Sequence, residues 1–240
     1  MDEYPLALVT GAAHRLGRIF ALTLARKKYT ILLHYHGSSD AARKTADEIR
    51  AMGSAVHPLK ADLTDTSQIN SLFSSIDELG IPLRVLINSA SEMMRSDLRS
   101  ISSIDFDRSM NLNLRAPLLI AKGAAERMKE GGLIVNISDA GVGKLWTGYP
   151  AYMISKSGLE TLTRLQAKLY APNIRVNAIA PGLILKSQNI EQAEWDRLAS
   201  RLPLKHVPRV EDIASALEFL LENQSLTGQT IVVDSGYSLL

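Results

Sequence analysis

Short, uninterrupted apolar segments recur along the chain and alternate with longer stretches of mixed polarity. An apolar run with no polar alternation is typical of a parallel strand that is buried on both faces of its sheet. On this pattern we predict seven strands, at residues 6–9, 29–35, 55–59, 83–87, 133–137, 174–179 and 230–233.

Between these segments, apolar residues recur at three- and four-residue spacing, which predicts amphipathic helices. The best example lies before residue 79, where apolar positions from Ile69 to Leu79 share one face and Thr64 or Asp65 is the expected N-cap. Ser39 or Asp40 is expected to cap the preceding helix. The predicted helices cover residues 18–28, 40–52, 65–79, 104–129, 151–170, 190–201 and 210–222.

Regular alternation of strand and helix indicates a parallel sheet covered by helices on both faces. We therefore predict a doubly wound α/β fold of the Rossmann type, with about seven strands in a three-layer α/β/α arrangement. No linker, repeat or low-complexity tract divides the chain, so residues 1–240 are expected to form a single domain.

Composition narrows the possible functions. The 27 basic and 25 acidic residues leave a formal net charge of only +2 and are scattered, which argues against a nucleic-acid surface. The chain has no cysteine, so disulfides and thiolate metal sites are excluded. Neither a signal peptide nor an apolar run of roughly 20 residues is visible. We expect a cytoplasmic protein with no metal site and no membrane or nucleic-acid partner.

A glycine-bearing turn, Thr10 to Gly17, joins the first strand to the first helix. Such a turn directs backbone N–H groups and the positive end of the helix toward a bound phosphate. Five residues separate the glycines Gly11 and Gly17, and Arg15 stands where a dinucleotide-binding fingerprint normally has its middle glycine. This motif alone is a weak signal.

Small and polar residues follow the other strands as well. In an open parallel sheet, ligands bind in the crevice beyond the carboxyl ends of the strands, so these residues are candidates for binding. Taken singly, Asp62 could merely cap a helix and Asn88 could satisfy turn backbone. The strand-end segments are residues 10–17, 34–39, 62–63, 88–91, 138–141 and 181–183.

The end of the second strand favours one nicotinamide cofactor over the other. A site that prefers NAD usually presents a carboxylate there to the ribose 2′-hydroxyl. This chain has Tyr35-His36-Gly37-Ser38-Ser39, with no acidic residue before Asp40. His14, His36 and the serine hydroxyls could instead donate to a 2′-phosphate, so we expect NADP(H).

Tyr152 and Lys156 form a second constellation, because residues four apart on a helix share a face. A nearby ammonium favours the phenolate and is expected to lower the pKa of the tyrosine, which suits a general acid. An isolated pair of this kind is more often an ordinary surface feature.

Together, these features closely resemble the short-chain dehydrogenase/reductase family over nearly the whole chain. The matching pieces are Thr10-Gly11 to Gly17, Asp62-Leu63, Asn88-Ser89-Ala90, Asn113, Tyr152-x3-Lys156, Pro181-Gly182 and the ending Thr227 to Gly236. The resemblance implies that Tyr152 and Lys156 hold the nicotinamide ribose, and that Asn113 supports a water relay to the lysine. It also implies a homotetramer or a dimer built partly from the long helices.

The expected cofactor-binding residues combine the strand ends with this resemblance. They are Gly11, His14, Arg15, Leu16, Gly17, Tyr35, His36, Gly37, Ser38, Asp62, Leu63, Asn88, Ser89, Ala90, Ser138, Tyr152, Lys156, Pro181, Gly182 and Leu183.

Three departures from the family pattern resemble the pteridine and dihydromonapterin reductases. These are Arg15, the segment His34-Tyr35-His36, and Asp139 in place of the usual catalytic serine thirteen positions before Tyr152. Met93 stands where those enzymes have a stacking aromatic residue, and Trp146 or Tyr149 could supply the missing surface. The expected substrate-binding residues are Arg15, Ser91, Met93, Asp139, Trp146, Tyr149 and Tyr152.

Asp139 also carries a physical argument. An ionised carboxylate only accepts hydrogen bonds and would repel a developing alkoxide, but it suits a substrate that offers N–H groups. The expected function is therefore NADPH-dependent reduction of a C=N bond in a pterin or dihydropterin, with Asp139, Tyr152, Lys156 and Asn113 as catalytic residues. A 3-oxoacyl-thioester reductase and a non-catalytic NADP(H)-binding regulator are the alternatives, and Asp139 could also be a simple turn residue.

Overall fold

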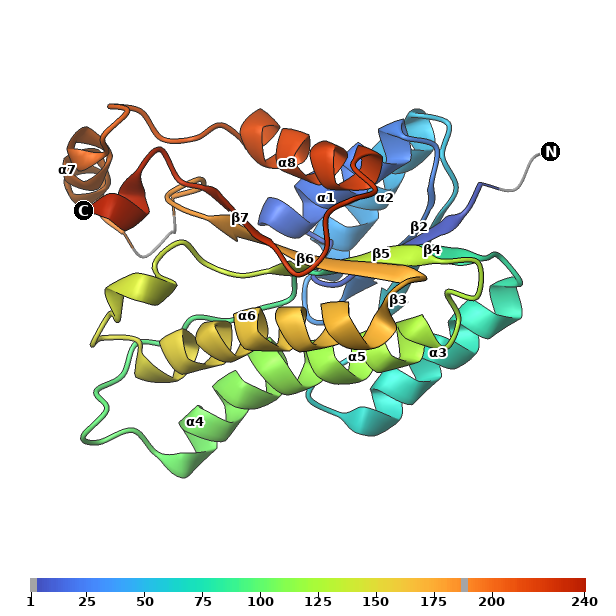
Figure 1. Ribbon diagram of the computed structural model, residues 1–240, viewed down its shortest axis with the longest axis horizontal. Helices are drawn as coiled ribbons and strands as arrows, with labels where there is room; N and C mark the ends of the chain where they lie inside the picture. Colours follow the sequence, from blue (N-terminus) through green and yellow to red (C-terminus); the bar gives the residue numbers. More distant parts are fainter. Residues whose placement is uncertain (1–3, 187–189) are drawn as a thin grey trace.

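A seven-stranded, all-parallel sheet forms the centre of the computed structural model, which describes residues 4–186 and 190–240 (Figure 1). The strand order is β3-β2-β1-β4-β5-β6-β7, so the chain winds outward in both directions from the pair β1 and β4. The strands are β1 (Leu6–Val9), β2 (Thr30–Tyr35), β3 (Val56–Lys60), β4 (Leu83–Asn88), β5 (Gly132–Ile137), β6 (Ile174–Pro181) and β7 (Thr230–Val233).

Helices cover both faces of this sheet, with α1, α2 and α8 on one face and α3 to α6 on the other (Figure 1). The α-helices are α1 (Arg15–Arg26), α2 (Ser39–Ala51), α3 (Thr66–Leu79), α4 (Ser103–Met110), α5 (Ala116–Ala125), α6 (Pro150–Tyr170), α7 (Gln192–Arg201) and α8 (Val210–Glu222). Shorter turns are the π-helical η1 (Asn111–Arg115) and the 3-10 turns η2 (Val142–Lys144) and η3 (Tyr237–Leu239). The predicted fold class is confirmed.

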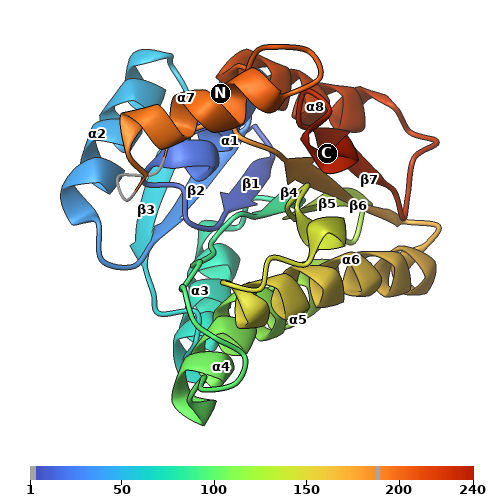
Figure 2. The same cartoon turned by 90° about the vertical axis from the view of Figure 1, so that its left-hand side faces the viewer.

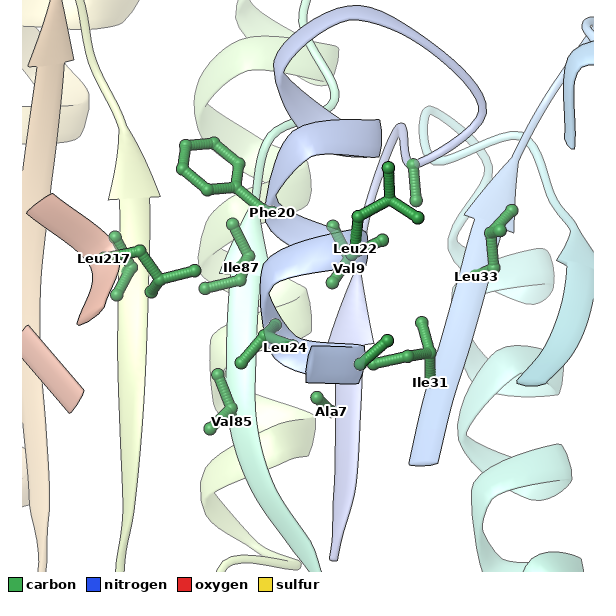
Figure 3. Close-up of a cluster of buried hydrophobic side chains, with 14 of the residues drawn as sticks. Ala7, Val9, Phe20, Leu22, Leu24, Ile31, Leu33, Val85, Ile87 and Leu217 are labelled. Atoms are coloured by element: carbon green, nitrogen blue, oxygen red, sulfur yellow. The ribbon is translucent and has the colours of Figure 1, made fainter. Parts of the chain in front are cut away.

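Two hydrophobic cores lie on opposite faces of the sheet, because successive side chains of a strand point to opposite sides. Ala7 and Val9 of β1 belong to one core, where they pack with Phe20 of α1 and Leu217 of α8 (Figure 3). Leu6 and Leu8, which alternate with them, belong to the other core under α3 and α5. Burial on both faces explains why the strands read as continuous apolar runs.

The predicted helix over residues 104–129 is wrong as a single element. Helix α4 passes through η1 into α5, which ends at Ala125. Pro117 lacks the N–H that an α-helix would direct at the carbonyl of Asn113, and the Ala116 N–H donates five residues back, to Asn111. The chain therefore widens by one residue at Asn113, a position that the sequence also marked as chemically important.

Smaller differences concern the ends of helices. Helix α1 begins at Arg15 rather than at residue 18, and α2 has Ser38 as its N-cap rather than Ser39 or Asp40. Asp65 is confirmed as the N-cap of α3, where its carboxylate accepts from the Ser67 N–H. Helix α7 begins at Gln192. Among the described residues, no helix is both long enough and apolar enough to cross a membrane.

Candidate active site

The carboxyl ends of the strands border a cavity of about 760 Å³. This edge of the sheet faces the viewer in Figure 2. Every expected cofactor-binding residue lines the cavity except Asn88, whose side-chain N–H instead donates to Asn136 in the buried layer beneath. The position of these residues at strand ends therefore correctly predicted that residues as far apart in sequence as Gly11 and Leu183 line one cavity.

The turn after β1 is held in place by the strands beside it. The Thr10 hydroxyl accepts from the backbone N–H groups of Ser89 and Ala90 at the end of β4, at 2.9 and 3.0 Å. Gly17 packs directly on the backbone of Gly11, since a Cβ added at Gly17 would lie 2.1 Å from the Gly11 oxygen. This close approach brings the start of α1 up to the turn and fits the binding of a dinucleotide pyrophosphate.

A Gly17→Ala variant is expected to disturb this turn, because the added methyl group meets backbone atoms that cannot move aside cheaply. Overpacking of this kind costs about 1–3 kcal/mol. We expect a lower Tm and weaker NADPH binding, measured by thermal unfolding and by the fluorescence of bound NADPH. Gly143→Ala is the matched control, because nothing lies within 4 Å of a Cβ at that position. Equal Tm values for the two variants would contradict the expected crowding.

His34 supports the same turn and was missed as a site residue. Its Nδ1 accepts from the Gly11 N–H at 3.1 Å, and its Nε2 lies 3.0 Å from the Ala61 carbonyl oxygen. These two contacts require a neutral ring with its proton on Nε2. Burial lowers the pKa of His34 to about 4. The signal available in the sequence was its position at the end of β2, opposite the glycine turn.

Stability is expected to fall in acid because of His34. Its pKa is about 4 in the folded protein against 6.5 when unperturbed, so between these pH values only the unfolded chain binds the proton. The contribution of His34 to the free energy of unfolding is fully present above pH 6.5. As the pH falls toward 4, roughly 3 kcal/mol of it is lost. The free energy of unfolding, measured with denaturant at several pH values in this range, should depend less steeply on pH for His34→Gln. Identical slopes for the variant and the wild type would exclude His34 as the cause.

Arg15 adopts a left-handed backbone conformation, with φ of +52°. This explains why glycine is usual at this position, since a side chain there costs about 1–2 kcal/mol. The guanidinium donates to the carbonyls of Leu185 and Lys186, at 2.9 and 3.3 Å. Arg15 lines the cavity as expected, and it ties the turn after β1 to the segment after β6.

The end of the cavity beside β2 has the composition expected for NADP(H). Tyr35, His36, Gly37 and Ser38 line it without an acidic residue among them. Asp62 also lines it, but its carboxylate accepts from the backbone and hydroxyl of Thr64 and lies 4.0 Å from His36. Asp62 therefore lines the cavity and stabilises the turn before α3, whereas the N-cap of that helix is Asp65 and not Asp62.

The Tyr152 hydroxyl donates to the Asp139 carboxylate at 2.7 Å, and the other carboxylate oxygen accepts from the Gly141 N–H at 2.7 Å. Burial raises the pKa of Asp139. Burial, and then the negative charge of Asp139, raise the pKa of Tyr152 well above its usual value. The expectation that the lysine would lower the pKa of this tyrosine is wrong for this arrangement, because the carboxylate is the nearer charge.

Lys156 is fully buried one helical turn along α6 from Tyr152. Its ammonium donates to the Ile137 carbonyl at 2.7 Å and lies 5.7 Å from the centre of the Tyr152 ring. Burial lowers the pKa of Lys156 to about 8. The two residues face the same cavity, so they are not the surface pair that was the alternative.

Asn113 does not line the cavity but organises its wall from behind. Its side-chain oxygen accepts from the Ser91 hydroxyl and the Glu92 N–H, and its side-chain N–H groups donate to Glu92 O and to the Ser155 hydroxyl. Both ends of the amide are therefore occupied. Any relay through Asn113 depends on its main-chain carbonyl, which Pro117 cannot use.

The expected substrate residues divide into two groups. Arg15, Ser91, Met93, Asp139, Trp146 and Tyr152 all line the cavity. Tyr149 does not, because it precedes the first turn of α6 and its ring packs edge-on against Trp146, 6.3 Å between centres. The sequence also missed Glu92, Arg108, Leu112 and Trp195, which line the cavity from loops and helices with no motif of their own.

Comparison with known proteins adds two kinds of similarity. Residues 11–238 match the family model described as enoyl-(acyl carrier protein) reductase. The chain is 31% identical to the 1-cyclohexenylcarbonyl-CoA reductase of Streptomyces collinus, over 100% of this chain and 89% of that protein. It is 29% identical to a 3-oxoacyl-(acyl-carrier-protein) reductase of Staphylococcus aureus, over 96% of each. The structure of FolM alternative dihydrofolate reductase 1 from Brucella suis with NADP superimposes with a TM-score of 0.94 at 32% identity, covering 100% and 97% of the two chains.

Proposed function

Because the chain belongs to the short-chain dehydrogenase/reductase family, we propose that it is a single-domain NADPH-dependent reductase of a pterin or dihydropterin. The substrates considered are of the dihydrobiopterin, dihydromonapterin and dihydrofolate class. The observation that carries the proposal is the hydrogen bond between Tyr152 and Asp139 inside the cavity, at the position where the family usually has a serine.

NADPH is the cofactor and would supply a hydride to the substrate. The turn from Gly11 to Gly17 would hold its pyrophosphate, and His36 and Ser38 would face the 2′-phosphate. Lys156 and Tyr152 would hold the nicotinamide ribose. This assignment leaves the Asp139 side of the cavity for the substrate.

Asp139 favours a substrate with N–H donors, such as the 2-amino-4-oxo edge of a pterin. As a carboxylate it accepts only, and as a carboxylic acid it can pass a proton to a ring nitrogen. Its raised pKa brings the protonated form within easier reach. The carboxylate would regain its proton from solvent through the open cavity, while the Tyr152 hydroxyl that donates to it holds it in place. The hydride and this one proton together complete the reduction of the ring C=N bond.

The comparisons favour two different substrates. The match in three dimensions to an alternative dihydrofolate reductase, at a TM-score of 0.94, supports the pterin. Sequence similarity to a 3-oxoacyl-(acyl-carrier-protein) reductase supports the second candidate, a carbonyl reductase of 3-oxoacyl thioesters. We favour the pterin because an ionised Asp139 would repel the alkoxide that forms when a ketone is reduced.

The test is to follow NADPH oxidation with a panel of dihydropterins, oxidised pterins, dihydrofolate and 3-oxoacyl thioesters. We expect kcat/KM to be greatest for one of the pterins or folates. A thioester that is turned over far faster than every pterin would overturn the proposal in favour of the carbonyl reductase. NADPH binding with no turnover of any substrate would instead favour a non-catalytic regulator.

The protein is expected to form a homotetramer or a dimer through its long helices. Helices α5 and α6 expose large apolar side chains, which an interface would bury. These are Leu118, Ile154, Leu165 and Leu169. Light scattering at micromolar concentration should give a multiple of the chain mass, and the mass of a single chain would refute this expectation.

A further inference from the structure

The C-terminal turn η3 lies near η2, on the same side of the molecule, although the two turns are almost a hundred residues apart in sequence (Figures 1 and 2). Tyr237 of η3 packs edge-on against Trp146, with 6.0 Å between ring centres and 61° between planes. Trp146 lines the cavity and Tyr237 does not. Tyr237 therefore supports the indole from behind.

Lys144 fixes the C-terminal turn to this support. Its ammonium donates to the main-chain oxygens of Tyr237 and Leu240, at 3.1 and 2.6 Å. The same ammonium lies 4.6 Å from the centre of the Tyr237 ring, within the range of a cation–π contact. One lysine next to the cavity thus makes three contacts with a segment that carries none of the family's catalytic motif.

Asp234 anchors the other end of the turn. Its two carboxylate oxygens accept from the N–H groups of Gly236 and Ser238, at 2.8 and 2.7 Å. Asp234 also packs against Gly182, where an added Cβ would lie 2.6 Å from the Asp234 Cβ. Gly182 lines the cavity on the side expected to bind the cofactor. The segment that leads into the turn therefore packs against this side through Asp234, and the turn itself is held by Lys144.

Trp146 in turn lies directly over the loop that holds Asp139. A Cβ at Gly141 would be 2.4 Å from the indole and 2.9 Å from the Asp139 carboxylate, and the Gly141 N–H donates to that same carboxylate. The indole and the carboxylate thus both lie against the space where a side chain at Gly141 would begin. The pKa of Tyr237 is raised, first by burial and then by the charge of Asp139, in keeping with this short chain of contacts.

We infer that Tyr237 and Lys144 are positioning residues that hold the Trp146 indole as a flat wall beside Asp139, and that this wall selects a planar heteroaromatic substrate over a flexible acyl chain. The selection of a planar substrate rests on the proposed function. The support of Trp146 by the C-terminal turn does not. A ring stacked on a fixed indole gains contact area at little entropic cost, whereas an acyl chain gains less from a rigid plane.

The kinetic test compares Tyr237→Ala, Tyr237→Phe and Lys144→Met, with Lys168→Met on the exposed side of α6 as a matched control. Loss of the aromatic support should raise KM for the best pterin by roughly 3- to 10-fold. The kcat value and the Kd for NADPH should change less than twofold. Tyr237→Phe keeps the ring and should restore the KM of the wild type. A KM unchanged in both Tyr237→Ala and Lys144→Met, or an equal fall in kcat and NADPH affinity, would overturn the inference.

A spectroscopic test needs no substrate. Trp146 and Trp195 are the two tryptophans of the chain, so a Trp195→Phe background isolates the emission of Trp146. Tyr237→Ala and Lys144→Met should shift that emission to the red and increase its quenching by acrylamide, while Lys168→Met should not. Unchanged emission would overturn the positioning role. If the wild type reduces no pterin but the emission shifts, the proposed function fails while the support of Trp146 stands.

Discussion

A Tyr152→Phe variant is expected to lose about 10²- to 10⁴-fold in kcat for NADPH oxidation with a dihydropterin, the usual contribution of a positioned general acid. The variant removes only the hydroxyl, which donates to Asp139 at 2.7 Å in the cavity. Without it, Asp139 loses the hydroxyl that holds its carboxylate in place for proton transfer to the substrate. The aromatic ring remains in the wall of the cavity, so the shape of the cavity should not change.

The control is Tyr170→Phe, at the other end of the same helix and outside the cavity. It should keep the kcat and the NADPH Kd of the wild type. Tyr152→Phe loses one of the two groups expected to hold the nicotinamide ribose, so its NADPH Kd should rise, but by no more than about tenfold. Turnover by Tyr152→Phe at the rate of the wild type would remove Tyr152 from the chemistry. Loss of NADPH binding in that variant would instead mean that the hydroxyl serves mainly to hold the cofactor.

Much of the fold was predictable because the central strands, β1, β2, β4, β5 and β6, are buried on both faces. A strand such as residues 31–33 must then be apolar throughout, and such a run cannot be mistaken for one face of a surface helix. The position of the site followed from the same fact, since parallel strands bring all their carboxyl ends to one edge. The sequence alone therefore predicted that Gly11, Asp62 and Pro181 lie at one edge of the sheet, and all three line the cavity.

What the sequence could not predict depends on contacts that have no local signature. The widening of the helix at Asn113 follows from one missing N–H at Pro117, and the hydrophobic spacing on either side does not reveal it. The sequence marks His34 as part of an unusual segment, but it does not show that the ring accepts from the Gly11 N–H. Tyr149 was expected in the cavity as a substitute for the stacking aromatic residue missing at Met93, yet it lies outside the cavity and packs edge-on against Trp146.

The electrostatics of the site could be predicted only in part. The sequence places Lys156 one turn from Tyr152, which suggested a lowered pKa for the phenol. In the structure, the lysine ammonium donates to a backbone carbonyl, and the pKa of the phenol is raised, first by burial and then by the Asp139 carboxylate that it faces. The spacing of residues identifies neighbours along one helix. It does not show whether their charges affect the phenol more than a residue from a distant loop does, such as Asp139 after β5.

Replacing Asp139 by serine is expected to exchange one substrate class for another. The change removes an acceptor that suits ring N–H groups and introduces a hydroxyl that can donate to a ketone oxygen. We expect kcat/KM for the best pterin to fall by about 10- to 100-fold, the effect of losing a hydrogen bond to a charged group. Activity with a 3-oxoacyl thioester should rise.

Asp139→Asn separates charge from shape in the same experiment. It keeps the size of the side chain and one acceptor oxygen, but it cannot transfer a proton, so it should also lose pterin turnover. Neither variant should lower the Tm. Burial raises the pKa of Asp139, so the charged carboxylate is disfavoured in the folded protein and its replacement by a neutral side chain should not destabilise it. Pterin turnover that survives in both variants would show that Asp139 is only a turn residue. The choice between a C=N and a C=O substrate would then rest on the shape of the cavity alone, and the alkoxide argument would lose its force.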